Sequence, residues 1–153
     1  MRSVVLVFGA MLFATVARAA SPEMGNGYGA IDAVRDISPS QLGQLFCAAR
    51  LKADMDPIVP FIAPKLKSIL DEAGSPGAIT WQSYDERPHS CSIEIVNGYD
   101  NTIGVLVRLT YVSDAHQWSD VLNLERTPES WRLNNIFFGV GGNLRFKLFD
   151  NAH

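Results

Sequence analysis

The sequence predicts an α+β domain in which N-terminal helices pack on one face of a curved antiparallel sheet. Apolar residues recur at helical spacing between residues 38 and 73, and they alternate with polar residues from about residue 91 to residue 138. Turn-forming residues separate the alternating runs. Strands that each have one apolar face need a cover, and the two amphipathic helices ahead of them can provide it.

Residues 1–20 have the pattern of a cleavable secretory signal. Arg2 places a positive charge near the start, residues 4–16 are apolar and uncharged, and small residues precede the expected cleavage after Ala19 or Ala20. The apolar run is shorter than the roughly 20 residues that cross a bilayer. We therefore expect a periplasmic or secreted protein without a membrane span after cleavage.

The rest of the chain divides into a leader and one domain. Residues 21–37 are rich in glycine and predict a flexible leader, and residues 38–149 are enough for a single α+β domain with its own core. The net charge is -3, and the 13 lysines and arginines form no cluster. Nucleic acid is therefore not an expected partner, because phosphate binding needs a concentrated basic patch.

Two helices are expected before residue 75. Ser38 and Gln41 have the spacing of a capping box, and the apolar stripe that follows extends to about Lys52. The prolines of residues 56–60 interrupt the helix. A second helix is expected from residues 61–64 to residue 73, with Gly74 as its stop.

Four strands are expected after the helices, at about residues 91–95, 103–111, 118–125 and 131–138. Residues 143–149 fit either a short helix or an edge strand. Charges of alternating sign fall on the sheet face opposite the helices, where we expect solvated cross-strand pairs and no site. These residues are Glu94, Arg108, Glu125 and Arg132.

The two cysteines, Cys47 and Cys91, are expected to form a disulfide in an exported protein. It would join the first helix to the first strand. Two buried free thiols are the alternative. A metal site is not expected, because none of the three histidines is spaced from a cysteine as structural zinc sites require.

Helices followed by a meander of antiparallel strands, with a closing strand that begins at Trp131, resemble a known superfamily. Trp131, Leu133 and Ile136 follow the turn at residues 127–130 and are similar to the closing strand of the nuclear-transport-factor-two-like and ketosteroid-isomerase-like superfamily. The residues that follow, Gly141 to Leu144, resemble the tail of an exported bacterial domain of unknown function in that group. The resemblance covers about residues 38–149. It implies a cystatin-like roll with a cone-shaped pocket between sheet and helices, and members use this pocket for isomerisation, dehydration, ligand binding or protein pairing.

Five residues are the candidates for ligand or partner binding. Trp81, Tyr84 and Asp85 lie in a polar loop between the helices and the sheet, where partly exposed aromatic side chains beside charges are typical of interfaces. Strict alternation puts Trp118 and Asp120 on the apolar face of the third strand. Because Asp120 is near the strand end, we expect its carboxylate to reach solvent.

No catalytic residue and no cofactor are assigned. An isomerase of this type would need a buried carboxylate and an oxyanion donor. Tyr99 and Asp100 have the right side chains but fall in a turn, while Tyr84 and Asp85 fall in a charged loop. The chain contains no nucleophile elbow, phosphate-binding loop or dinucleotide fingerprint.

The leading functional hypothesis is a non-enzymatic exported protein that binds a small ligand or a partner protein in the cell envelope. The first alternative is an isomerase- or dehydratase-type enzyme with Asp120 or Asp100 as its base. The second is an inhibitor or immunity-type protein for an envelope enzyme. A homodimer is compatible with the sequence, which does not specify the oligomeric state.

Overall fold

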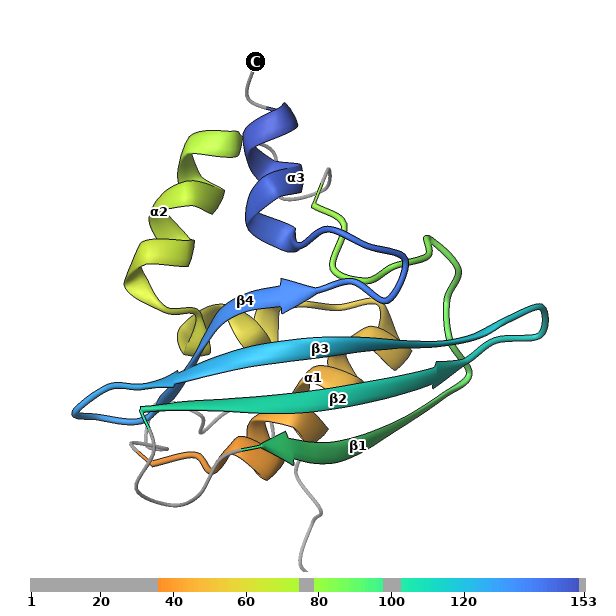
Figure 1. Ribbon diagram of the computed structural model, residues 1–153, viewed down its shortest axis with the longest axis horizontal. Coiled ribbons are helices and arrows are strands. Elements are labelled where there is room, and N and C mark those ends of the chain that lie inside the picture. The colour runs from red at the N-terminus through yellow and green to blue at the C-terminus, as the bar shows by residue number, and fades with distance from the viewer. Residues whose placement is uncertain (1–35, 75–78, 98–102, 152–153) are drawn as a thin grey trace, which may run out of the picture. The chain divides into compact units, whose positions relative to one another are not determined.

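The structure, a computed structural model, describes residues 36–74, 79–97 and 103–151 (Figure 1). The predicted signal, most of the leader and the turn that holds Tyr99 and Asp100 lie outside the described residues. Within the described ranges, no helix is long and apolar enough to cross a membrane.

The strands form one open antiparallel sheet in chain order. The sheet consists of β1 (Ser90–Asn97), β2 (Gly104–Val112), β3 (Gln117–Arg126) and β4 (Trp131–Phe137), each paired with the next. Tyr111 lies opposite Trp118, and Leu122 lies opposite Ile136. Along β2 and β3, buried residues alternate with partly exposed ones, as the sequence predicts.

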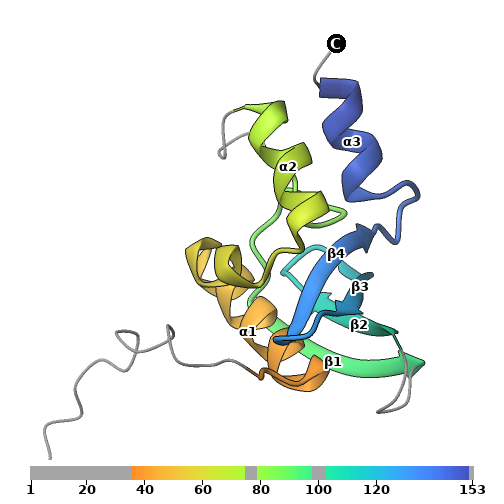
Figure 2. The same ribbon diagram turned by 90° about the vertical axis from the view of Figure 1, so that its left-hand side faces the viewer.

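The first helix, α1 (Pro39–Lys52), packs against β1 and β2 (Figure 2). Its predicted capping box is confirmed, because the Ser38 side chain accepts from the Gln41 backbone and the Gln41 side chain accepts from the Ser38 backbone. Gly43 lets the helix approach the sheet closely, since a β-carbon there would lie 2.9 Å from a Val107 methyl group.

The remaining helical segments each contact β4. The proline-rich segment is a short 3₁₀ helix, Asp56–Phe61, which links α1 to α2 (Pro64–Ala73). The second helix ends at Gly74, which has a φ of 90°, as the sequence predicts. The last segment is a helix, α3 (Leu144–Asn151), and it lies beside α2 (Figures 1 and 2).

The predicted disulfide is present between Cys47 of α1 and Cys91 of β1, with their Cα atoms 5.6 Å apart. The two cysteines are 44 residues apart in the sequence. On the chain-entropy account, a loop of this length contributes about 4 kcal/mol to stability. The disulfide therefore joins the helical layer to an edge strand of the sheet.

The core lies between the helices and the sheet, and this arrangement confirms the predicted α+β class. Four polar residues are buried there or at the core's edge, and they are the exceptions that require an explanation: Gln82, Asp120, Ser130 and Asn135. The fully buried large side chains are Leu42, Phe46, Ile58, Leu66, Leu109, Tyr111, Leu122, Leu124, Leu133, Ile136 and Leu144.

The charged face of the sheet contains cross-strand pairs, as the sequence predicts. Glu94 lies opposite Arg108, and their charged atoms are 2.7 Å apart. Glu125 lies opposite Arg132. The last two residues of the predicted leader also contact the domain. The Ile37 backbone donates to Ser130, and Asp36 pairs with Arg126 at 2.8 Å.

Candidate functional site

The five predicted binding residues have very different exposures. Asp85 is exposed and Tyr84 is half-buried. Trp81 is buried, with its ring edge-on to that of Phe46 at 6.5 Å, so the expectation of a partly exposed Trp81 is wrong. Trp118 is also buried. Only Tyr84 and Asp85 of the five are therefore available to a partner at the surface.

The expectation that Asp120 reaches solvent is also wrong, because its exposure is 0%. Its carboxylate accepts hydrogen bonds from the Ser83 backbone at 2.9 Å, from the Ser83 hydroxyl and from the Gly139 backbone at 3.0 Å. A buried carboxylate needs such donors to replace water. Asp120 thus attaches both the 79–89 segment and the turn after β4 to β3.

Two further contacts attach the 79–89 segment to α1. Arg50 donates through Nε to the side-chain oxygen of Gln82 at 3.0 Å. Arg87 donates through Nε and a terminal nitrogen to the Leu51 carbonyl oxygen, at 2.9 and 2.7 Å. The Leu51 carbonyl belongs to the C-terminal turn of α1, where cationic side chains such as Arg87 are favoured.

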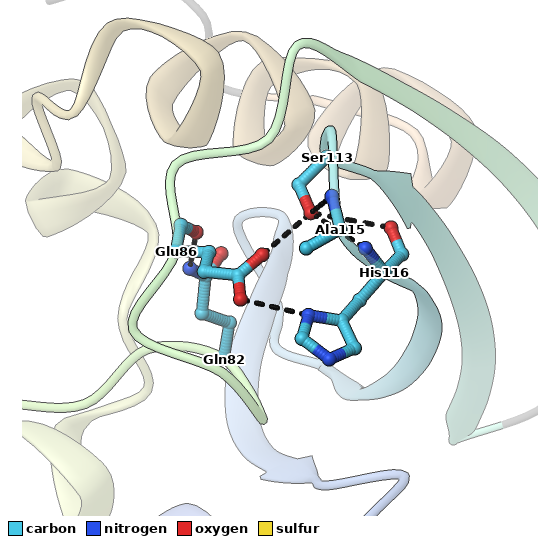
Figure 3. A network of polar contacts seen from close by, with 5 residues as sticks. All are labelled: Gln82, Glu86, Ser113, Ala115 and His116. Atoms are coloured by element: carbon cyan, nitrogen blue, oxygen red, sulfur yellow. Dashed lines mark hydrogen bonds and ion pairs between the residues drawn. The ribbon is translucent and has the colours of Figure 1, made fainter.

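Glu86 attaches the segment to the turn between β2 and β3 (Figure 3). One carboxylate oxygen accepts from the Ser113 hydroxyl at 2.6 Å, and the other lies 2.7 Å from Nδ1 of His116. The Glu86 backbone carbonyl accepts from Gln82 at 2.6 Å. The hydrogen bond from Ser113 and the nearby His116 lower the pKa of the Glu86 carboxyl.

These three side chains resemble a serine–histidine–acid set in composition, but their geometry is different. In a catalytic triad the serine bonds to the histidine, and the histidine bonds to the acid. Here Ser113 and His116 both bond to Glu86. The arrangement holds the loop on the turn, and it does not generate a nucleophile at Ser113.

We call Glu86, Ser113 and His116 the clasp. A row of aromatic rings leads from His116 of the clasp into the core. The His116 ring stacks on Tyr84 with centroids 5.0 Å apart, and Tyr84 lies 5.4 Å from Trp118. Trp118 in turn stacks on Tyr111 at 5.3 Å. Tyr84 therefore contacts both an exposed histidine and a buried tryptophan.

Two buried side-chain atoms in this region have no hydrogen-bond partner among the described residues, the Tyr111 hydroxyl and Nε1 of Trp118. Burial raises the pKa of Tyr111 well above its usual range, and the charge of Asp120 acts in the same direction. Burial also lowers the pKa of Arg50, while Tyr111 and Asp120 oppose that change. Arg50, Tyr111 and Asp120 are thus near enough to interact electrostatically.

No group of three or more metal-ligating side chains lies within the described part of the chain. The clasp residues Glu86, Ser113 and His116 were not among the predicted site residues. Glu86 and His116 both lie in polar stretches of the sequence, and a separation of 30 residues gives no local signal that they meet. Comparison of the chain with protein-family models, curated proteins and solved structures finds no match.

Proposed function

We propose that this chain is a non-enzymatic binding protein of the cell envelope, and that it presents Tyr84 and Asp85 to a partner protein. The observation that carries the proposal is the attachment of the loop on both sides of these two residues. Ser83 is bonded to Asp120, and Glu86 is bonded to Ser113 and His116. A loop held in one conformation loses less entropy on binding than a mobile one.

The chemistry of the two presented residues supports a protein partner. Tyr84 has a broad apolar ring with a polar end, and tyrosine is enriched among the residues that dominate binding energies at interfaces. Asp85 is exposed next to it and can pair with a cationic residue of the partner. The predicted signal and the disulfide support a location outside the cytoplasm.

We also propose membership of the nuclear-transport-factor-two-like superfamily. Helices on one face of an open antiparallel sheet support this proposal, as does β4 beginning at Trp131, the residue that opens the resembling strand. The superfamily contains both enzymes and binding proteins, so the site and not the fold has to decide the function.

A photo-crosslinking experiment tests the binding proposal. A benzophenone-bearing residue replaces Asp85 in cells that make the protein, and a matched variant carries it at Glu72 on α2, which is also exposed. We expect one discrete adduct from position 85, its loss when Tyr84 is also changed to alanine, and no such adduct from position 72. Equal adducts from both positions, or none from position 85, would contradict the proposal.

An isomerase- or dehydratase-type enzyme is the second candidate, favoured by the buried carboxylate of Asp120 near the Tyr111 hydroxyl, which has no partner among the described residues. The hydrogen bonds of Asp120 argue against it. A carboxylate has about four acceptor positions, and three donors from Ser83 and Gly139 already occupy Asp120. A general base has to reach the substrate proton, whereas this carboxylate is committed to the loops that enclose it.

An inhibitor or immunity-type protein is a special case of the binding proposal, in which the partner is an envelope enzyme. The crosslinked partner would then lose its activity when it is mixed with the purified protein. An adduct of twice the chain's mass would instead identify a second copy of this chain as the partner.

A further inference from the structure

A pocket of about 240 Å³ lies between β4 and α3, away from the proposed partner-binding loop. Its walls include two phenylalanines of α3, Phe146 and Phe149, which are 66% and 50% exposed. Asn135, Asn143 and Arg145 complete the lining. We propose that this pocket binds a small monocarboxylate with an apolar body, for which the protein has no other assigned site.

The two asparagines that line the pocket have side-chain oxygens that already accept hydrogen bonds. The side-chain oxygen of Asn135 accepts from the Ile136 and Arg145 backbones at 2.9 and 3.3 Å, and that of Asn143 accepts from the Phe146 backbone at 3.2 Å. An oxygen that accepts from backbone N–H groups fixes the orientation of its amide. The NH₂ groups therefore point elsewhere, and no described residue accepts a hydrogen bond from them.

Asn135 is the more informative of the two because it is only 8% exposed. A side-chain nitrogen that is fully enclosed in the core needs a protein partner. Among the described residues, the enclosed side-chain atoms without a partner belong to Tyr111 and Trp118, and the Asn135 nitrogen is not one of them. The nitrogen of Asn135 thus remains accessible, and the accessible space that this buried side chain lines is the pocket.

Arg145 supplies a positive charge. Its guanidinium donates to the backbone and side-chain oxygens of Asn134, which orients the group without neutralising it. No carboxylate in the described ranges lies within ion-pairing distance of Arg145, and none lines the pocket. Donors and a cation beside two aromatic walls match an acid group with an apolar body.

The size of the pocket limits the ligand. Sites for drug-sized molecules have volumes of about 300–1,000 Å³, so this pocket fits a smaller acid. The same chemistry is offered by a free aryl- or alkyl-carboxylic acid and by the C-terminus of a short peptide that ends in an apolar residue. The inference does not depend on the Tyr84–Asp85 proposal, because the two sites share no residue.

The test uses 3-phenylpropionate and its neutral amide as probes, with protein purified from the periplasm of an expression host. We expect the acid to shift the side-chain amide NMR signals of Asn135 and Asn143 saturably, and the amide to bind at least about tenfold more weakly. N-acetyl-alanyl-phenylalanine with a free or an amidated C-terminus forms a second arm. Binding of the free acid alone assigns a small metabolite-like acid, and binding of the free peptide as well assigns a C-terminus.

Variants test the assigned groups. Arg145→Gln removes the charge, and Asn135→Asp keeps the acceptor oxygen and the size of the side chain while replacing the donor. Each should weaken binding of the acid at least about tenfold, whereas Arg108→Gln on the sheet should leave it unchanged. Unchanged NMR spectra of the free variants, apart from local shifts, establish that they fold. Equal binding of the acid and the amide, no saturable shift, or an undiminished affinity of folded Arg145→Gln would overturn the proposal.

Discussion

Gly139 lies directly against the backbone of Ser119, so that a β-carbon on residue 139 would be 2.2 Å from the Ser119 carbonyl oxygen. This close approach brings the Gly139 N–H within 3.0 Å of the Asp120 carboxylate. The same carboxylate accepts from Ser83, so the turn after β4 and the loop ahead of β1 share one attachment point on β3.

Gly139→Ala should therefore be strongly destabilising. The neighbour it meets is backbone and cannot rotate away, so the turn after β4 has to shift and the bond to Asp120 lengthens. We expect a loss of about 2 kcal/mol or more in the free energy of unfolding, measured by urea denaturation under oxidising conditions. Gly104→Ala is the matched control, since its nearest backbone atom would be 3.6 Å away. A loss at residue 139 no larger than at residue 104 would show that the close approach is not maintained.

Asp120→Asn should cost about 2–3 kcal/mol in the free energy of unfolding. The amide keeps one acceptor oxygen but turns an NH₂ group toward donors from Ser83 or Gly139, leaving one of them unpaired in the core. Asp85→Asn, at an exposed position of the same loop region, should change stability by less than about 0.5 kcal/mol. If the two variants have the same stability, Asp120 does not hold the loops.

The clasp around Glu86 predicts a dependence of stability on pH. Because the folded state lowers the pKa of this carboxyl from 4.5, the clasp contributes fully above pH 4.5, and the contribution is lost as the pH falls through the folded-state pKa. The difference in thermal midpoint between wild type and Glu86→Gln should thus be fully developed above about pH 4.5 and shrink as the pH falls below that value. A difference that stays constant from pH 7 to pH 3 would mean that the Glu86 charge does not contribute.

Tyr111→Phe tests whether the buried hydroxyl of Tyr111 contributes to stability. The Tyr111 hydroxyl has no partner among the described residues, so its removal should leave the free energy of unfolding unchanged or raise it by up to about 1 kcal/mol. A loss of 1 kcal/mol or more, measured by urea denaturation, would show that the hydroxyl is hydrogen-bonded in the folded protein.

The local signals in the sequence were sufficient for α1, α2, the four strands and the disulfide, but they left residues 143–149 open between a helix and an edge strand. Ser38 and Gly74 mark helix ends through their own backbone chemistry, and strict alternation assigns Trp118 and Asp120 to the covered face of β3. These features depend on neighbours a few residues away. The pairing of Cys47 with Cys91 was predicted from the proposed export signal and an even cysteine count, and not from any contact between distant segments.

The burial of Asp120 could not be predicted in this way. Its donors at Ser83 and Gly139 are 37 and 19 residues away in sequence, and they come from segments without regular structure. The contact between Glu86 and His116 could not be predicted for the same reason. Both are polar residues in turns, and they contact each other only because the fold brings the two turns together. Position along the chain identifies the covered face of a strand, whereas the depth of burial depends on which loop closes over its end.

Tyr84, whose ring contacts His116 and Trp118, is the residue that we propose as the contact for a partner protein. The most direct test is the affinity of the crosslinked partner for wild type and for Tyr84→Ala, measured by calorimetry with both variants shown to be folded. We predict at least about a tenfold weaker affinity for Tyr84→Ala, because an aromatic contact at an interface centre is worth more than 1 kcal/mol. Equal affinities for the two proteins would contradict the claim.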